Sequence, residues 1–335
     1  MKRLLPFLGC VLTATLACGG PSSAPGPAAS PDQPITVHVA HAPSTLFAPL
    51  YVAIDRGYFA KQKVTVELDT IKAGQDAIAL AATGQIDVVV AGFSAGLFNG
   101  LNRGLEFKVV GSMGASPKDG AAPSALEVSK QLFDSGAVKS PADLRGRKIA
   151  LSGGNTAAGA FQADTVLQQA GLGLKDVTVV NLGFPDMEAA IRSGAVAAAL
   201  PPAPFTTRME ADGVAVKLGQ PPVGTTATGV IYGKTFLKNR DAAQRFFNGL
   251  ARAAQDLQGD QKKSPETLAT LAKYTGQTVE VLQKVPFYDW FPRLAPDVKS
   301  LDRMQATYRS LGLLDYPTNL KTSAYVDDSF SRKAP

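Results

Sequence analysis

The sequence predicts an α/β protein of two lobes, each a mostly parallel sheet flanked by helices, with a cleft between the lobes. Strand-like and helix-like segments alternate from residue 35 onward, which is typical of parallel sheets covered by helices. The same helix-to-strand turn also occurs twice, as "IALAATGQIDVVVAG" at 78–92 and as "EAAIRSGAVAAALPP" at 188–202. Each copy joins an Ala-rich helical run to a short apolar strand through a small hydroxyl residue and a glycine. We therefore expect two lobes of similar plan, each delivering a loop to one side of a shared cleft.

The first lobe begins with a strand at 35–42, "ITVHVAHA", in which β-branched residues alternate with others. A helix at 46–62 and a second strand at 64–71 follow. The run at 86–92 is apolar without interruption, as expected of a strand buried on both faces. A fourth strand, "EFKVVGSMG", is expected at 106–114.

The cycle begins again near residue 125. The expected elements are a helical turn and strand within 140–154, a helix at 155–172 stopped by Gly171, a strand at 177–183, a helix at 185–194, a strand at 196–202 and a strand-like run at 214–219. The chain then returns to the first lobe through 225–233 and forms helices at 239–258, 264–273, 277–284 and 296–312. This assigns 35–124 and 228–335 to lobe 1 and 125–227 to lobe 2, with a hinge where the chain crosses twice.

The composition is that of a globular protein. The chain has 335 residues, of which 45% are hydrophobic and 19% charged, with a net charge of +6. That length suffices for about two domains. Lys and Arg are scattered, without basic runs, zinc-type Cys/His spacing or interleaved aromatics, so nucleic acid is not an expected partner.

The amino-terminal segment predicts export. Residues 1–17 combine a basic start with a short apolar core and small residues, as signal peptides do. Cys18 follows directly in "TLACGG", which resembles a bacterial lipobox, although Thr15 replaces the usual Leu. The resemblance implies a lipid on Cys18; ordinary secretion with cleavage at the same bond is the alternative. Residues 18–34 would then be the lipidated cysteine and a Gly/Ser/Pro-rich tether, holding the protein in the periplasm or at the cell surface.

The cysteines limit the chemistry of the mature chain. The two cysteines, Cys10 and Cys18, lie in or at the edge of the export segment. The mature body therefore has neither a disulfide nor a thiol nucleophile nor a thiolate metal site, and we expect no metal and no cofactor. No later stretch is long and apolar enough to span a bilayer, so the lipid is the only expected membrane contact.

Five phrases in order resemble one known family. They are "PLYVAIDRGYFAKQKVTVEL", "GQIDVVVAG", "VKSPADLRGRKIAL", "QQAGLGLKDVTVVNL" and "PDMEAAIRSGAVAAAL". In this order they look like the SsuA/NMT1-like solute-binding proteins of ABC importers for alkanesulfonates, taurine, nitrate or thiamine-type pyrimidines. The resemblance covers about residues 35–260 and implies a periplasmic binding protein fold, type II-like. It also implies a monomer that traps a small-molecule ligand by hinge closure and presents it to the transmembrane subunits of an ABC permease.

One segment of the predicted cleft is "SGGNTAAGAF", which follows a strand and opens a helix. Gly153 and Gly154 allow close approach of the backbone, and Asn155 or Thr156 can cap the helix. Free amides at such a helix end form a site for an anionic or carbonyl oxygen. The alternative is a plain helix cap with no ligand.

Two segments of the first lobe repeat this pattern. In "GFSAG" at 92–96, Ser94 is the expected cap and Phe93 a wall of the cleft; in "HAPSTLF" at 41–47, Ser44 and Thr45 are candidates. A polar ring occupies the position of Phe47 in the thiamine-pyrimidine relatives, which implies a stacking face there, whereas a core position is the alternative.

The sequence departs from the family at one position. Relatives often carry an acidic residue in "EPF" after the second repeat strand, and this chain has Ala203 in "PPAPF". Without that carboxylate the cleft has less reason to prefer a cation. Phe205, Thr228 and Tyr232 supply apolar surface and hydroxyls instead. We therefore expect a neutral or anionic organic ligand: a sulfonate, a pyrimidine or vitamin-like molecule, or an aromatic acid.

Enzymatic functions are poorly supported by the sequence. "GFSAG" has the spacing of a hydrolase nucleophile turn, but the two histidines, His38 and His41, precede it, against the required order. The pyrimidine synthases that resemble these binding proteins need a cysteine-rich motif that the mature chain lacks. We expect no enzyme; a lyase of the same two-lobe fold is the alternative, and a structural lipoprotein without a ligand is a third. Trp290 is assigned to the core rather than to the cleft mouth.

Overall fold

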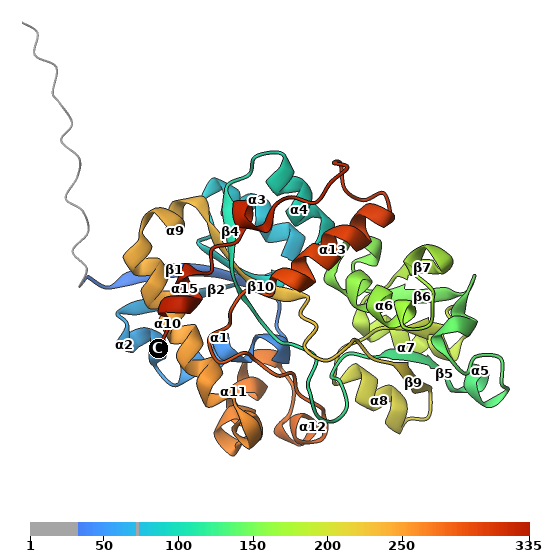
Figure 1. Cartoon of the computed structure of the whole chain (residues 1–335). Helices are drawn as coiled ribbons and strands as arrows, with labels where there is room; N and C mark the ends of the chain where they lie inside the picture. Colours follow the sequence, from blue (N-terminus) through green and yellow to red (C-terminus); the bar gives the residue numbers. More distant parts are fainter. Residues whose placement is uncertain (1–32, 72–73) are drawn as a thin grey trace, which may run out of the picture. The chain divides into compact units, whose positions relative to one another are not determined.

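The computed structural model describes residues 33–71 and 74–335. The predicted signal peptide at 1–17, Cys18 and nearly all of the predicted tether lie outside the described residues. Residues 34–335 form one compact unit, shown in Figure 1, that contains two five-stranded sheets.

The first sheet combines three parallel strands with one antiparallel strand from later in the chain. Its strand order is β2-β1-β3-β10-β4. β1, β2 and β3 run parallel, while β10 lies between β3 and β4 and runs antiparallel to both. The strands are β1 Ile35–His41, β2 Val64–Thr70, β3 Val88–Gly92, β4 Phe107–Ser112 and β10 Thr228–Gly233.

The second sheet repeats this plan with shorter strands. Its order is β7-β6-β8-β5-β9; β6 runs parallel to β7 and β8, and β5 runs antiparallel to β8 and β9. Its strands are β5 Leu126–Ser129, β6 Lys148–Leu151, β7 Thr178–Asn181, β8 Ala198–Ala199 and β9 Ala215–Gly219. We call the first sheet with its helices the first lobe, and the second sheet with its helices the second lobe.

Helices cover both faces of the first sheet because its central strands are apolar on both sides. In β3, Val88 and Val90 face one cluster of buried side chains and Val89 faces the other. The helices of this lobe are α1 Ala48–Asp55, α2 Tyr58–Lys61, α3 Gly74–Thr83, α4 Ala95–Asn102, α9 Lys234–Lys238, α10 Arg240–Asp256, α11 Pro265–Thr275, α12 Val279–Lys284, α13 Val298–Ser310, α14 Thr322–Tyr325 and α15 Ser329–Lys333.

The second lobe has fewer helices among the described residues. They are α5 Lys130–Asp134, α6 Ala158–Gln168, α7 Phe184–Arg192 and α8 Phe205–Ala211. The described residues of the two lobes also form short 3-10 helices, which are η1 Thr45–Phe47, η2 Pro141–Leu144, η3 Gly154–Thr156, η4 Leu174–Asp176 and η5 Gly259–Lys263. None of the helices in the described part of the chain is long and apolar enough to span a membrane.

The repeated turn adopts the same conformation in both lobes. α3 and α7 each end at a glycine with positive φ, 80° at Gly84 and 73° at Gly194. That conformation is accessible to glycine at little cost and stops the helix. The chain then enters β3 in the first sheet and β8 in the second, each beside the first parallel strand of its sheet. The prediction of two copies of one plan is confirmed.

One predicted helix is wrong in its extent. The helix expected at 46–62 is divided into η1, α1 and α2. The division between α1 and α2 falls at Gly57, whose φ of 68° is left-handed and interrupts the helical hydrogen-bond ladder. The predicted strands and the C-terminal helices α10, α11, α12 and α13 occur where the sequence predicts them, whereas β5 was not predicted.

Helix α13 packs on both lobes, as Figure 1 shows for its position between α4 and α6. Leu301, Met304 and Tyr308 on this helix belong to a single buried cluster that also contains side chains of β3 and of α6. The two lobes are therefore joined by packed apolar surface as well as by the crossing chain.

Candidate interlobe ligand site

A cavity of about 190 Å³ lies where the loops of the two sheets meet. Its walls come from the carboxyl ends of the parallel strands, where ligands of open α/β sheets generally bind. Both copies of the repeated turn contribute, through the residues after β3 and after β8. The lining residues are Ala42, Pro43, Ser44, Leu46, Phe47, Ala91, Gly92, Ser94, Ser124, Ser152, Ala157, Ala158, Gly159, Gln162, Phe184, Leu200, Pro202, Ala227 and Thr228.

The lobes approach each other closely beside this cavity. A Cβ added to Gly92, at the end of β3, would lie 2.9 Å from the Cβ of Ala158, the first residue of α6. Such a contact is shorter than side chains tolerate, so glycine is required for the observed approach of the two lobes.

Several helix amino ends border the cavity. Three of them belong to η1, α4 and α6, and the first two carry serine caps. The Oγ of Ser44 accepts a hydrogen bond from Leu46 N (3.2 Å) at η1. The Oγ of Ser94 accepts one from Leu97 N (3.3 Å) at α4. The capping role predicted for Ser94 is thereby confirmed. The amino ends of helices carry partial positive charge and favour oxygen-rich or anionic groups.

The third amino end belongs to α6 and has no side-chain cap. Its N-cap residue is Ala157, and the first two helical residues, Ala158 and Gly159, line the cavity. The first backbone N–H groups of a helix have no partner inside the helix. They are therefore available to a ligand in the cavity.

The predicted capping of this helix by Asn155 or Thr156 is wrong. Gly153 and Gly154 both take positive φ, 77° and 62°, and the chain makes the 3-10 turn η3 before α6 begins. The Oγ1 of Thr156 donates to Gly153 O (3.1 Å), closing this turn. The lining of the cavity contains none of Gly154, Asn155 and Thr156.

Thr228 presents an unpaired hydroxyl at the cavity. It is the first residue of β10, is 4% exposed, and lines the cavity. Its Oγ1 is buried and has no hydrogen-bond partner among the described residues. Because buried hydroxyls in proteins nearly always have a partner, the hydroxyl of Thr228 is a candidate hydrogen-bonding group for a ligand in this cavity.

The walls are otherwise neutral and partly aromatic. No Asp, Glu, Lys, Arg or His is among the described residues that line the cavity. The rings of Phe47, which is buried, and Phe184, which is half-buried, face it. Ser124 is held by a hydrogen bond of 2.7 Å between its Oγ and the hydroxyl of Tyr288. Burial raises the pKa of Tyr288 to about 12, so its hydroxyl keeps its proton.

Several residues selected from the sequence lie outside the lining. Thr45 is buried beside it, and Phe93 packs its ring against Gly229. Phe205 contacts Phe184 with ring centroids 5.9 Å apart, one layer behind the wall. Tyr232 is in the core, where its hydroxyl donates to Ala243 O (2.9 Å).

Trp290 is buried in the core, as predicted. It is 2% exposed, and its Nε1 donates to the carbonyl oxygen of Leu46 (2.9 Å). Because Leu46 lines the cavity, the tryptophan fixes part of the wall without touching its interior.

The sequence analysis missed four polar or aromatic lining residues, which are Ser124, Ser152, Gln162 and Phe184. Ser152 and Phe184 directly follow predicted strands, and that position was the available signal. Ser124 and Gln162 reach the cavity only through the packing of the lobes, for which the sequence contains no local signal.

Tyr308 links the lobes behind the cavity. Its hydroxyl lies 3.1 Å from Phe93 O in the first lobe and 3.0 Å from Ala157 O in the second. A hydroxyl has one proton, so Tyr308 donates to one of these carbonyls at a time. The neighbouring Thr307 donates its hydroxyl proton to Asp164 Oδ2 on α6 (2.8 Å).

At the hydrolase-like spacing around Ser94, the serine and the two histidines each have partners other than one another among the hydrogen bonds and ion pairs of the described residues. The Oγ of Ser94 is engaged at α4. His41 Nδ1 lies 3.0 Å from the hydroxyl of Tyr51, and burial lowers the pKa of His41. His38 Nδ1 lies 3.5 Å from a carboxylate oxygen of Glu67. In the described part of the chain, no cluster of His, Cys, Asp and Glu could hold a metal ion.

The sequence matches a family model described as NMT1/THI5 like, over residues 44–264. The chain belongs to the NMT1/THI5-like family. No curated protein sequence matches the chain. Family membership therefore rests on the model, which spans both sheets.

Solved structures show the same fold. The alkanesulfonate-binding protein SsuA from Xanthomonas axonopodis pv. citri, bound to MOPS, is 19% identical, with a TM-score of 0.68 over 88% of this chain and 99% of that one. The periplasmic nitrate-binding protein NrtA from Synechocystis PCC 6803 is 15% identical, with a TM-score of 0.69 over 89% and 87% of the two chains. This NMT1/THI5-like chain therefore has the periplasmic binding protein fold.

An enzyme also matches at lower similarity. The desulfurization enzyme DSZB is 16% identical, with a TM-score of 0.57 over 88% of this chain and 98% of that chain. At this identity the match concerns the fold, which is compatible with binding proteins and with enzymes.

Proposed function

We propose that this protein is the extracytoplasmic solute receptor of an ABC importer and binds a small organic molecule in the interlobe cavity. The observation that carries the proposal is the unpaired Oγ1 of Thr228, which shares a neutral cavity with the uncapped amino end of α6. Membership of the NMT1/THI5-like family and the likeness to the sulfonate-binding and nitrate-binding folds support it.

The cavity favours a compact ligand with an oxygen-rich head. Helix amino ends and hydroxyls suit a neutral or anionic head, and Phe47 and Phe184 suit an apolar or aromatic body. An engineered cavity of about 150 Å³ holds benzene, so about 190 Å³ suits one ring or a short chain with its head group. Sulfonates, pyrimidine or vitamin-like molecules and aromatic acids are the proposed classes.

The receptor would act outside the cytoplasm. Residues 1–17 would direct export, a lipid on Cys18 would anchor the tether at 18–34, and the protein would act as a monomer. Residues 35–124 with 228–335 would close as one lobe on residues 125–227 and deliver the solute to the permease. The separate sheets, with β10 in the first and β9 in the second, support this division.

A thermal-shift screen of the full chain tests the proposal, with sulfonates, nitrate, pyrimidines, flavins and aromatic acids as probes. A ligand present at 100 times its Kd stabilises the folded state by about 2.7 kcal/mol. For a chain of this size that is a shift of a few degrees. We expect a shift with one class and recovery of the compound unchanged. Consumption of the compound would instead support the lyase alternative, and no shift with any class would contradict the proposal.

A further inference from the structure

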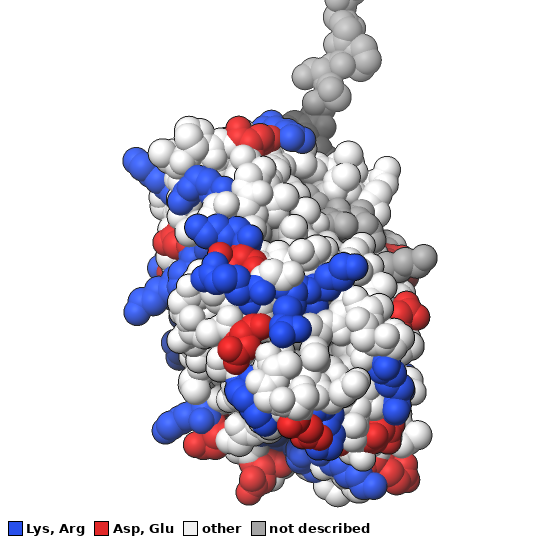
Figure 2. Space-filling view, turned by 90° about the vertical axis from the view of Figure 1, so that its right-hand side faces the viewer, with Lys and Arg blue, Asp and Glu red and all other residues white. Residues whose placement is uncertain are grey.

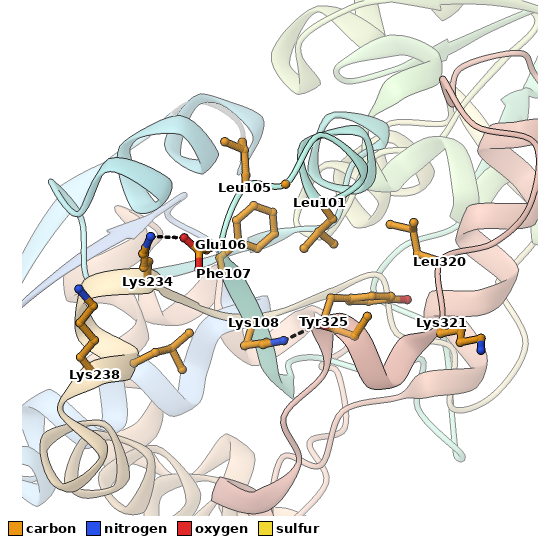
Figure 3. Close-up of a pocket in the computed structure, with 13 residues that line it drawn as sticks. Leu101, Leu105, Glu106, Phe107, Lys108, Lys234, Lys238, Leu320, Lys321 and Tyr325 are labelled. Carbon is orange, nitrogen blue, oxygen red and sulfur yellow. Dashed lines mark hydrogen bonds and ion pairs between the residues drawn. The ribbon is translucent and has the colours of Figure 1, made fainter.

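A second hollow lies at the far end of the first sheet and is larger, about 630 Å³. Figure 3 shows its composition: apolar side chains, including Leu101, Leu105 and Phe107, form the floor, and lysines surround it. We call this hollow the lysine groove and define it by these three residues with Lys238 and Lys321, which lie on opposite sides of the floor.

The rim of the lysine groove is strongly basic. Lys108 and Lys234 also border it, and its one acidic lining residue, Glu106, is ion-paired with Lys234. Lys108 donates to the carbonyl oxygen of Ala324. Lys238 and Lys321 are exposed, and their side-chain ammonium groups have no hydrogen-bond or ion-pair partner among the described residues.

The face shown in Figure 2 has a different distribution of charge. On this face, acidic residues are interspersed among the basic ones. In the second lobe, Glu188 contacts both Arg192 and Arg208, at 3.0 Å and 2.9 Å. The lysine groove therefore combines positive charge that is only partly neutralised with exposed apolar surface, including Leu105 at 39% exposure.

Topology places the groove at the end where the described chain begins. β4 runs parallel to β1, because β10 is antiparallel to β3 and to β4, and β3 is parallel to β1. The first residues of β1 and β4 thus lie at one end of the sheet, and the groove contains the start of β4. The interlobe cavity lies at the opposite ends of these strands.

We propose that, while the protein is not docked on the permease, the lysine groove binds acidic phospholipids and lays this end of the first lobe on the membrane, with the interlobe cavity open to incoming solute. Lys238 and Lys321 contact the phosphate groups, and the floor with Leu105 contacts the adjoining acyl region. An apolar floor open to the outside suits a lipid surface better than an acidic protein segment. The inference rests on the proposed membrane anchoring and is independent of the solute.

Lysine footprinting of the full chain tests this, with Cys18→Ser preventing lipidation. Exposed amines are acetylated in the presence of vesicles of phosphatidylglycerol with phosphatidylcholine, or of phosphatidylcholine alone. We expect protection of Lys238 and Lys321 by the acidic vesicles only, with Lys139 and Lys175 of the second lobe labelled equally in both. Because each residue is read separately, vesicle contacts of the amino-terminal segment do not obscure the result.

Two charge-reversal double variants, one in the lysine groove and one in the second lobe, give a test and its matched control. Each lysine near an anionic surface contributes roughly fivefold to binding, so Lys238→Glu with Lys321→Glu should weaken binding to acidic vesicles by roughly 25-fold or more. Lys139→Glu with Lys175→Glu changes the net charge equally and should have a much smaller effect. Equal losses in the two variants, or equal labelling of Lys238 and Lys321 in both vesicle types, would overturn the proposal. The thermal-shift screen without vesicles tests the solute proposal separately.

Discussion

At the scale of single residues, Thr228 and Thr206 form a natural pair for experiment. Both are 4% exposed, and the Oγ1 of each has no hydrogen-bond partner among the described residues. Only Thr228 lines the interlobe cavity. We expect Thr228→Val to weaken ligand binding by roughly tenfold, which corresponds to one hydrogen bond of about 1.5 kcal/mol, without lowering protein stability.

Calorimetric titration with the compound found in the screen measures this effect. Thr206→Val removes an equally buried hydroxyl away from the cavity and should leave affinity unchanged. If the two valine variants bind alike, Thr228 does not contact the ligand.

Glu127 in β5 predicts a pH dependence of stability. It is 0% exposed, and neither carboxylate oxygen has a hydrogen-bond partner in the described part of the chain. Its pKa is raised from 4.5 to about 8, mainly by burial and also by the nearby Glu210, while Lys217 acts in the opposite direction. Between these two pH values the folded state holds a proton that the unfolded state has lost. Glu127 therefore makes the free energy of unfolding fall as pH rises from 4.5 to about 8.

Glu127→Gln should remove this contribution, because the amide does not titrate. In urea unfolding from pH 5 to pH 8, the free energy of unfolding of the variant should increase relative to that of the wild type as pH rises. The total change should be on the order of a few kcal/mol. A constant difference between the two proteins across this range would show that Glu127 does not titrate there.

At the level of elements, α13 connects the two lobes through Tyr308, and we expect this connection to favour lobe closure. Burial raises the pKa of its hydroxyl, which therefore stays a neutral donor to either Phe93 O or Ala157 O. Tyr308→Phe should remove about 1 kcal/mol from the closed state and weaken ligand binding by roughly fivefold.

Tyr232→Phe is the matched control, because its equally buried hydroxyl donates to Ala243 O within the first lobe. It should lower the melting temperature similarly while leaving affinity unchanged. Equal affinity in both variants and the wild type would show that the Tyr308 bond does not favour closure.

Local sequence signals predicted where helices and strands occur more accurately than they predicted where each helix begins. The repeated turns were predictable because each depends on one glycine that ends a helix, at Gly84 and Gly194. The start of α6 was not, because Gly153 and Gly154 together form an extra turn that moves the cap position to Ala157. Two adjacent glycines have too many accessible conformations for a sequence pattern to select one.

The sequence also did not determine which residues of β10 reach the cavity. Thr228 and Tyr232 point to one face of this strand, since side chains alternate along it. The strand rises about 3.3 Å per residue, so only its first residue reaches the cavity, and Tyr232 lies in the core. Which end of a strand meets the cleft depends on tertiary packing, and that packing also brings in Ser124 and Gln162.

For the whole molecule, the alternation of strands and helices and the repeated turn predicted a plan of two lobes. The structure has this plan, with one five-stranded sheet in each lobe. The cavity depends on features of both sheets at once: Ser94 and Thr228 in the first lobe, and Ala158 and Gly159 in the second. A ligand that contacts both sets stabilises the closed arrangement by its differential affinity for it.

Hydrogen exchange of the full chain, with and without the compound found in the screen, tests whether the ligand contacts both lobes. We predict that the ligand slows amide exchange in 157–163 of the second lobe and also in 92–97 and 228–230 of the first, because it occupies the free amides of α6 and holds the lobes together. Segment 104–109 at the lysine groove should exchange as before. Protection confined to one lobe, or absent from 157–163, would contradict a ligand site between the lobes.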